Sequence, residues 1–353
     1  MRRRALFRCD GSTQIGTGHI MRCLSLAEGL KKKDWQCNFV MKDYDARLAD
    51  KIKEKGFELR LIPKESSLKE DLKLTRKYAS QWKVSIILTD SYDLDREYLK
   101  GLKEGPFFFL SIDDSTQTHF YSHILLNQNI HATAREYQGK IELYTKLLLG
   151  PKYALLREDF ASNRKAKGIS EKVQKVLVTM GGGDPYNQSL KVLRALDSME
   201  GAFSITVLLG SSFLFQEEIE IFTRRTSKKI KIVQNTNQVA RLMKESDLAI
   251  SAAGCTVWEL CCLGVPTILL ILSENQEPIA QSLHKKGIMK NLGWFNQVYE
   301  PHIQREVSKL SSGQKLRQEM SDKGQLLVDG LGVKRVVKEI EEGLKNEENK
   351  NQK

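Results

Sequence analysis

A histidine, His19, lies where a glycine-rich loop turns into an amphipathic helix. The apolar residues 5–7 predict a short strand, and the following loop contains Gly16 and Gly18. Backbone N–H groups at such a turn point outward at the positive end of the helix dipole. A neutral imidazole there can take a proton from water near neutral pH. The residue types therefore predict proton transfer beside a phosphorylated substrate. The alternative is a histidine that only satisfies local backbone groups at a helix start.

A second glycine-rich loop, 180–187 (MGGGDPYN), follows an apolar run in the second half of the chain. Gly182 and its neighbours could present N–H groups to a diphosphate. We expect Asp184 to be the N-cap and Pro185 the first residue of the next helix. The loop lacks the Gly-Lys-Ser/Thr of a Walker loop, and the alternative to a binding role is a structural turn.

A third candidate site lies in residues 251–270, where a small-residue loop precedes a helix that carries Glu259. A carboxylate one turn into such a helix can accept hydrogen bonds from both hydroxyls of a ribose, although glutamates on helices are commonly just solvated. The next apolar run ends in Asn275 and Gln276, which offer amide donors and acceptors.

Polar residues also follow three predicted strands in the first half, at 89–92, 113–114 and 127–129. Because the carboxyl ends of parallel strands share one edge of a sheet, we expect these residues near His19. One carboxylate of the pair at 113–114 is expected to orient the imidazole, as carboxylates do in catalytic triads.

Two other histidines, His119 and His123, have the i, i+4 spacing of metal ligands. The glutamate of an H-E-x-x-H motif is missing, and the segment is expected to be a loop. We therefore predict no metal.

Short apolar runs alternate with amphipathic stretches along nearly the whole chain, which predicts parallel sheets covered by helices. The strands expected are 5–8, 37–42, 59–62, 86–89, 107–112, 124–127, 147–149, 176–180, 205–209, 230–233, 248–251 and 267–272. The predicted fold is α/β, with two doubly wound domains that face each other across a cleft. The expected parts are an N-terminal domain (1–160), a linker (161–175), a C-terminal domain (176–340) and a charged tail (341–353).

Composition limits the classes of protein that the chain can belong to. The 353 residues have a formal net charge of +12, but the lysines are scattered, without the aromatic-interleaved basic stripe of nucleic-acid binders. An anionic small molecule suits this charge equally well. No apolar run reaches the ~18–20 residues of a membrane span, and no signal-peptide core is present. The six cysteines have no C-x-x-C spacing, which favours reduced thiols and a cytoplasmic location.

Taken together, these motifs resemble one enzyme family. The runs IGTGHIMRCLSLA, LTDSY, SIDD, LLNQN, YALLREDF, MGGGDPYN, SAAGCTVWEL and ENQEP occur in this order between about residues 4 and 290. They are similar to the UDP-sugar hydrolases of pseudaminic acid biosynthesis, which release UDP from UDP-2,4-diacetamido-2,4,6-trideoxy-β-L-altropyranose. The resemblance implies the two-domain glycosyltransferase-B fold.

The same resemblance implies roles for particular residues. His19 matches the proposed general base of the family, and Tyr92, Glu259 and Asn275 match its ligand contacts. The full set of substrate contacts that we expect is Gly16, Gly18, Tyr92, Asn127, Arg157, Gly182, Glu259, Asn275 and Gln276. Water deprotonated by His19 would attack the anomeric carbon opposite UDP, with inversion. No metal, cofactor or obligatory protein partner is expected. The alternatives are a UDP-sugar glycosyltransferase with a sugar or lipid acceptor and a non-enzymatic nucleotide-sugar binder.

Overall fold

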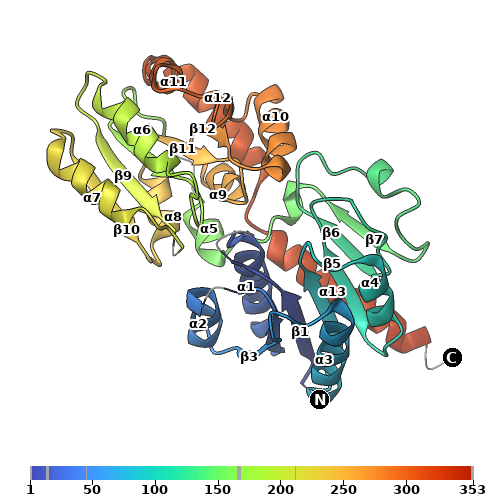
Figure 1. The fold of residues 1–353 in the computed structure, drawn as a ribbon. Helices are drawn as coiled ribbons and strands as arrows, with labels where there is room; N and C mark the ends of the chain where they lie inside the picture. Colours follow the sequence, from blue (N-terminus) through green and yellow to red (C-terminus); the bar gives the residue numbers. More distant parts are fainter. Residues whose placement is uncertain (1, 13–15, 45, 165–167, 211, 351–353) are drawn as a thin grey trace. The chain divides into compact units, whose positions relative to one another are not determined.

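Two compact units make up the protein, and each contains one parallel β-sheet flanked by helices (Figure 1). The first unit comprises Met1–Leu156 and Leu331–Lys353, and the second comprises Arg157–Gly330. The computed structural model describes residues 2–12, 16–44, 46–164, 168–210 and 212–350. The expected α/β fold with two doubly wound sheets is confirmed.

The first unit has a seven-stranded sheet in the order β3-β2-β1-β4-β5-β6-β7, with all neighbours parallel. Its strands are β1 (Arg4–Cys9), β2 (Gln36–Met41), β3 (Glu58–Leu61), β4 (Ile86–Asp90), β5 (Phe108–Ile112), β6 (Ile124–Asn127) and β7 (Lys146–Leu149). Its helices are α1 (Gly18–Lys31), α2 (Ala46–Glu54), α3 (Leu68–Gln81), α4 (Arg96–Lys103) and α13 (Gly332–Lys350), with short 3-10 turns η1 (Ala134–Tyr137) and η2 (Pro151–Tyr153).

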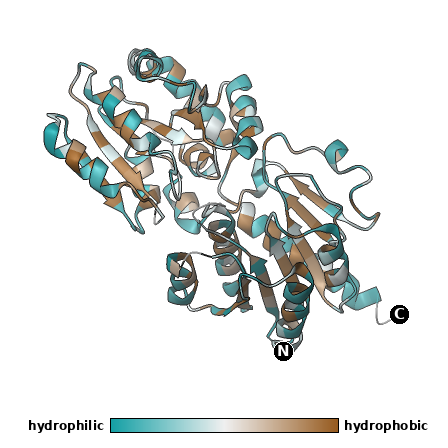
Figure 2. Cartoon of the chain, viewed as in Figure 1, coloured by the Kyte–Doolittle hydropathy of each residue, from teal (hydrophilic) through white to brown (hydrophobic). Residues whose placement is uncertain are grey.

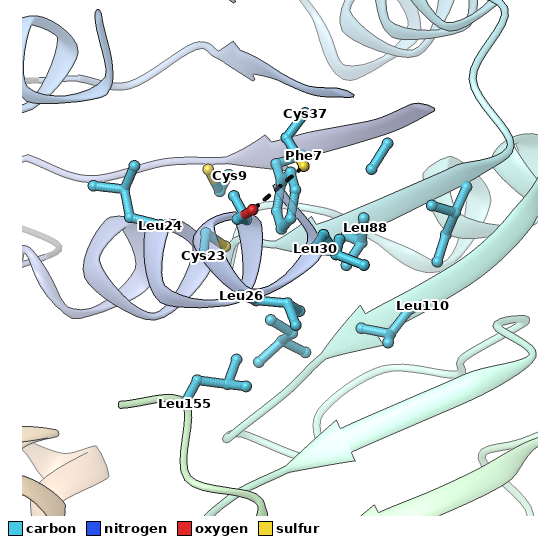
Figure 3. Close-up of a cluster of buried hydrophobic side chains, with 14 of the residues drawn as sticks. Phe7, Cys9, Cys23, Leu24, Leu26, Leu30, Cys37, Leu88, Leu110 and Leu155 are labelled. Carbon is cyan, nitrogen blue, oxygen red and sulfur yellow. Dashed lines mark hydrogen bonds between the residues drawn. The ribbon is translucent and has the colours of Figure 1, made fainter. Parts of the chain in front are cut away.

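Successive side chains of β1 point to opposite faces of the sheet, and both faces are apolar. Phe7 lies in the cluster shown in Figure 3, together with Leu26 of α1, whereas Leu6 lies in the cluster on the opposite face. Successive side chains of a strand point to opposite faces, so a strand covered on both sides is apolar throughout. Figure 2 shows this pattern as brown strands beneath helices with teal outer faces.

The last helix, α13, belongs to the first unit, whereas we expected residues 176–340 to form the C-terminal domain and 341–353 a charged tail. Val336 and Ile340 of α13 are fully buried in the first unit's core. A Cβ on Gly29 of α1 would lie only 2.3 Å from Val333, so the two helices pack closely. The segment is rich in charged residues, but its apolar residues recur at helical spacing and form one face that packs against the core. Residues 351–353 lie outside the described residues.

The second unit repeats the same topology in a six-stranded sheet of order β10-β9-β8-β11-β12-β13. Its strands are β8 (Lys175–Thr179), β9 (Ser204–Leu209), β10 (Ile230–Gln234), β11 (Leu248–Ala252), β12 (Thr267–Ile271) and β13 (Lys290–Trp294). Its helices are α5 (Glu158–Asn163), α6 (Gln188–Asp197), α7 (Gln216–Arg225), α8 (Val239–Lys244), α9 (Thr256–Leu263), α10 (Glu277–Lys285), α11 (Glu300–Ser312) and α12 (Gln314–Leu327), with the 3-10 turn η3 (Glu274–Gln276).

The segment expected as a linker, 161–175, starts inside helix α5 of the second unit. Buried Phe160 lies on this helix, and α5 contacts α8 and α9. Residues 165–167 lie outside the described residues. No described helix has the length and apolar character needed to cross a membrane.

Candidate active site

The expected base lies at the point in the first sheet where the strand order reverses. Strands β1 and β4 are neighbours there, and Cys9 at the end of β1 is in register with Asp90 at the end of β4. His19 is the second residue of α1, the helix that follows β1. Ligands of open α/β sheets bind at this switch point, outside the carboxyl ends of the strands.

A buried ion-pair cluster fixes the imidazole of His19. Its Nδ1 lies 2.5 Å from Oδ1 of Asp90, and the Arg22 guanidinium donates to both oxygens of the same carboxylate at 2.5 and 2.6 Å. All three side chains are buried. A carboxylate that accepts the proton of Nδ1 sets the tautomer in which Nε2 carries the lone pair. This is the histidine–carboxylate arrangement of a general base.

The Asp90 carboxyl is held in its ionised form. Burial by itself would raise its pKa, but the charges and hydrogen bonds of Arg22 and His19 outweigh burial and lower the pKa to about 2. Asp90 therefore stays a proton acceptor for the imidazole at any physiological pH.

The structure brings Tyr92 against this histidine. The two rings meet edge to face with centroids 4.6 Å apart, and 44% of Tyr92 is exposed. Gly18 begins helix α1, and Gly16 has a φ of +92° that a side chain rarely tolerates. Four of the expected site residues thus lie along one short loop-and-helix segment and the end of β4.

A second buried charge network, which the sequence did not indicate, supports the loop after β4. Asp10 accepts hydrogen bonds from the Ser91 hydroxyl at 2.8 Å and from the backbone N–H groups of Lys42 and Asp43. Arg8 pairs with Asp10 at 2.7 Å and with Asp71 at 2.6 Å. Through these hydrogen bonds and ion pairs, the network connects the loops that follow β1, β2 and β4.

Asp90 orients the histidine, so the prediction that Asp113 or Asp114 does so is wrong. Asp113 instead accepts a hydrogen bond from the Tyr137 hydroxyl at 2.7 Å, and Asp114 accepts one from Arg22 at 3.1 Å. Asn127, expected to contact substrate, is fully buried. Its amide donates to Tyr137 and its carbonyl accepts from the Asn129 N–H, so both ends serve the interior of the unit.

The two histidines at metal-like spacing have separate partners. His119 pairs with Glu142 at 2.9 Å, whereas His123 lies 2.8 Å from the amine of Lys103. Among the described residues, no group of three or more His, Cys, Asp or Glu side chains is arranged to hold a metal ion.

In the second unit the switch point lies between β8 and β11, and glycine backbone lines it. Gly181 has a φ of +82°, and a Cβ on Gly210 would lie 2.1 Å from the carbonyl oxygen of Gly182. The loop therefore packs backbone against backbone, which only glycine permits. The N-cap of the next helix is Asn187, so the prediction that Asp184 takes this position is wrong, although the Asp184 carboxylate accepts the N–H groups of Gln188 and Ser189. The helix begins at Gln188, so the prediction that Pro185 is its first residue is wrong.

The remaining second-unit candidates lie at the ends of β11 and β12. Glu259 is half-buried in the first turn of α9. The Gln276 amide lies 3.7 Å from the position a Cβ would take on Gly254, and its carbonyl accepts the Leu272 N–H. Asn275 is exposed and accepts a hydrogen bond from the Ser273 hydroxyl. The structure thus brings Gln276 to the loop that leads into the helix of Glu259.

Arg157, the other expected contact, lies at the N-terminus of α5. Its guanidinium pairs with Asp159 at 3.2 Å and stacks over the Phe160 ring. These contacts hold it at the start of the second unit.

Comparisons with known proteins identify the class. The chain resembles the crystal structure of MurG from Acinetobacter baumannii with a TM-score of 0.70, at 16% identity over 96% of this chain and 99% of that one. Residues 171–347 match the glycosyltransferase family 28 C-terminal domain. Two doubly wound units of this kind define the glycosyltransferase-B fold.

Sequence relatives identify the family. The chain is 31% identical to the UDP-2,4-diacetamido-2,4,6-trideoxy-beta-L-altropyranose hydrolase of Campylobacter jejuni, over 80% of this chain and 97% of that enzyme. It is also 30% identical to a protein of Methanocaldococcus jannaschii, over 78% of this chain but only 57% of that longer protein. The chain belongs to the family of the altropyranose hydrolase, as the motifs of its sequence indicated.

Proposed function

We propose that the protein hydrolyses a UDP-linked 2,4-diacetamido-2,4,6-trideoxy hexose to the free sugar and UDP. The observation that carries this proposal is the hydrogen bond between His19 and Asp90 at the switch point of the first sheet. It leaves Nε2 as the proton acceptor, beside an exposed tyrosine and at the N-terminus of a helix. Membership of a UDP-sugar hydrolase family supports the substrate class.

In the proposed reaction, Nε2 of His19 takes a proton from water as the water oxygen attacks the anomeric carbon. The bond between that carbon and the UDP oxygen breaks, and the configuration at the carbon inverts. The ionised Asp90 stabilises the imidazolium that forms, as the carboxylate of a catalytic triad does. Arg22 keeps Asp90 in place through its two hydrogen bonds.

The second unit is proposed to bind the UDP moiety. N–H groups of the Gly181–Gly183 loop would stabilise the negative charge that develops on the departing diphosphate. Glu259 would accept the ribose hydroxyls, and Asn275 with Gln276 would add amide contacts. A Cβ on Gly181 would meet nothing within 4 Å, so a ligand can approach the backbone there, which supports this assignment.

A transferase is the second candidate function. The match to the family 28 C-terminal domain and the likeness to MurG favour it. The same base would then deprotonate an acceptor hydroxyl in place of water, so the geometry of His19 and Asp90 serves both reactions.

The test is UDP release from the purified protein and UDP-2,4-diacetamido-2,4,6-trideoxy-β-L-altropyranose in buffer without any acceptor. We expect multiple turnovers and one free sugar for each UDP. Release that begins only when a sugar or lipid acceptor is added would establish the transferase instead. The control variant His119→Asn lies in the same unit but pairs with Glu142, and we expect it to retain full activity.

A further inference from the structure

The carboxylate of Asp114, at the edge of the candidate active site, is bonded to the His19 cluster at one point. Asp114 follows strand β5, and its Oδ2 accepts a hydrogen bond from Nη1 of Arg22 at 3.1 Å. Its side chain is only 10% exposed. The other oxygen, Oδ1, is buried and has no hydrogen-bond donor among the described residues. Within this part of the chain, the Arg22 guanidinium is thus the partner that holds this buried carboxylate.

The neighbouring Asp113 has a different task, which is to fix the loop after β5. It accepts hydrogen bonds from the backbone N–H groups of Ser115 and Thr116 and from the Tyr137 hydroxyl. Asp114 makes none of these bonds. A buried carboxylate with one unpaired oxygen costs free energy, and such a group in a native structure calls for an explanation.

The charges of the cluster do not cancel. Arg22 carries one positive charge, and its guanidinium is hydrogen-bonded to two carboxylates, those of Asp90 and Asp114. Carboxylates in such contacts are ionised at neutral pH. With a neutral imidazole on His19, one negative charge is therefore in excess. Protonation of His19 cancels this excess, and buried charges are most stable when they are paired.

Arg22 by itself opposes protonation of His19, because its Nη2 lies 3.0 Å from Nδ1 of the imidazole. Asp90 offsets the charge of Arg22, so a second negative charge is needed to balance the imidazolium. Asp114, bonded to Nη1 of the same guanidinium, supplies that charge. One guanidinium separates Asp114 from His19, and salt screens buried charges much less than exposed ones.

Other titratable groups near the cluster add no charge to it at neutral pH. They include Tyr92 beside the imidazole, the Cys23 thiol beside the Asp90 carboxylate, and His131. Burial raises the pKa of the Cys23 thiol, and burial lowers the pKa of His131 although the charges of Glu136 and Asp114 oppose this. A tyrosine is uncharged near neutral pH. The excess negative charge therefore depends on Asp114.

We propose that Asp114 is a positioning residue for the general base: through Arg22, its charge stabilises the imidazolium of His19 and makes the imidazole a stronger base. This role rests on the proposed function, in which the proton moves from water to Nε2 of His19. No bond to Asp114 forms or breaks in that step. The two carboxylates on Arg22 then have separate tasks, because Asp90 sets the tautomer of the imidazole and Asp114 balances its charge.

The test is an NMR titration of His19 in protein labelled with ¹³C-histidine, with and without Asp114→Asn. Asparagine has nearly the same shape and keeps an acceptor for Arg22, but it carries no charge. The titrating signal is assigned by its loss in His19→Asn. We expect the midpoint of the His19 titration to fall by about one pH unit in Asp114→Asn, because the imidazolium loses a balancing charge. An unchanged midpoint would overturn the proposal.

Further variants separate the charge of Asp114 from charge at this edge in general. Asp93→Asn removes a charge from the exposed loop after β4 and should leave the midpoint unchanged. Asp114→Glu keeps the charge and should titrate closer to the unaltered protein than Asp114→Asn does. Equal shifts in Asp93→Asn and Asp114→Asn would contradict an effect that acts through Arg22. Should Asp114→Asn not fold, Asp114→Ser removes the same charge.

The pH dependence of turnover gives a second readout, which a merely structural fault would not imitate. In Asp114→Asn we expect the acid limb of the kcat/KM profile to move to lower pH by about one unit. The plateau should fall by about three- to tenfold, because a weaker base takes the proton more slowly. A lower plateau with an unmoved limb would refute the charge effect. If the unaltered protein released no UDP, the proposed function would fail, and the NMR midpoint would still decide the effect of Asp114.

Discussion

The two units share one topology but present different chemistry at the same place in it. In the first unit, the switch point between β1 and β4 holds charged side chains, His19, Asp90 and Arg22, that are buried and bonded to one another. In the second, the switch point between β8 and β11 holds glycine backbone and a half-buried glutamate. The same Rossmann-like topology thus places a histidine–carboxylate pair at the switch point of the first unit and glycine backbone at the switch point of the second. The two units thus differ in the residues that follow the strands and not in the sheet, and we propose that this difference separates the chemical step from nucleotide binding.

This division predicts that removal of the base affects turnover and leaves nucleotide binding intact. For His19→Asn we expect kcat to fall by about 10³–10⁴-fold, since general-base catalysis is lost. UDP affinity, measured by calorimetry, should stay within about twofold. If UDP affinity fell by as large a factor as kcat, the first unit would also contribute to nucleotide binding.

Asp90→Asn should have the next largest effect. The imidazole would lose the acceptor that sets its tautomer, and the Arg22 guanidinium would stay buried without its carboxylate. We expect kcat to fall by about 10²–10³-fold and the unfolding temperature to drop. An active, equally stable variant would contradict the role assigned to Asp90, and Asp93→Asn on the exposed loop nearby is the control.

In the second unit, Gly210→Ala tests the backbone packing. Its Cβ would meet the carbonyl of Gly182 at 2.1 Å, so the loop must shift. We expect UDP affinity to fall by about tenfold or more and stability to fall by about 1–3 kcal/mol. Gly168→Ala, where a Cβ meets nothing within 4 Å, is the matched control. Unchanged UDP binding in Gly210→Ala would remove the loop from the nucleotide site.

Acid should weaken the first unit through Asp90. Its pKa in the folded chain, about 2, is below the unfolded value of about 3.9. The group therefore contributes stability that is fully present above about pH 3.9 and is lost as pH falls through about 2. Chemical unfolding followed between these values should show this loss in the unaltered protein and not in Asp90→Asn. Identical acid profiles would contradict the ion-pair account.

Glu259→Gln should have the smallest effect, confined to binding. One charge-assisted hydrogen bond contributes about 1.5–3 kcal/mol, so we expect UDP affinity to fall by about tenfold with kcat unchanged. The exposed Glu217→Gln in the same unit is the control. A fall in kcat with normal UDP binding would place Glu259 in the chemical step instead.

Much of the fold could be predicted because buried parallel strands are apolar throughout. The strand expected at 86–89 is β4 (Ile86–Asp90), and the one expected at 248–251 is β11 (Leu248–Ala252). Strand β13 was missed because it is a half-buried edge strand that includes Lys290 and Asn291. Helix α13 was missed because charged residues outnumber the buried valines and isoleucine that dock it.

Gly18, His19 and Tyr92 were predicted to belong to one site and the structure does bring them together, but the pairing of His19 with Asp90 was not predicted. His19 and Asp90 are 71 positions apart, and only the register of β1 with β4 brings their segments together. Asp113 and Asn127 also follow strands, yet they turn inward to Tyr137. A polar residue at a strand end can face a ligand or the interior, and local sequence does not distinguish the two.

The most direct test of hydrolysis by attack at carbon is turnover in ¹⁸O-labelled water, with both products read by mass spectrometry. The account predicts one ¹⁸O atom at the anomeric hydroxyl of the released sugar and none in UDP. Label in the β-phosphate of UDP would show attack at phosphorus and contradict the role given to His19.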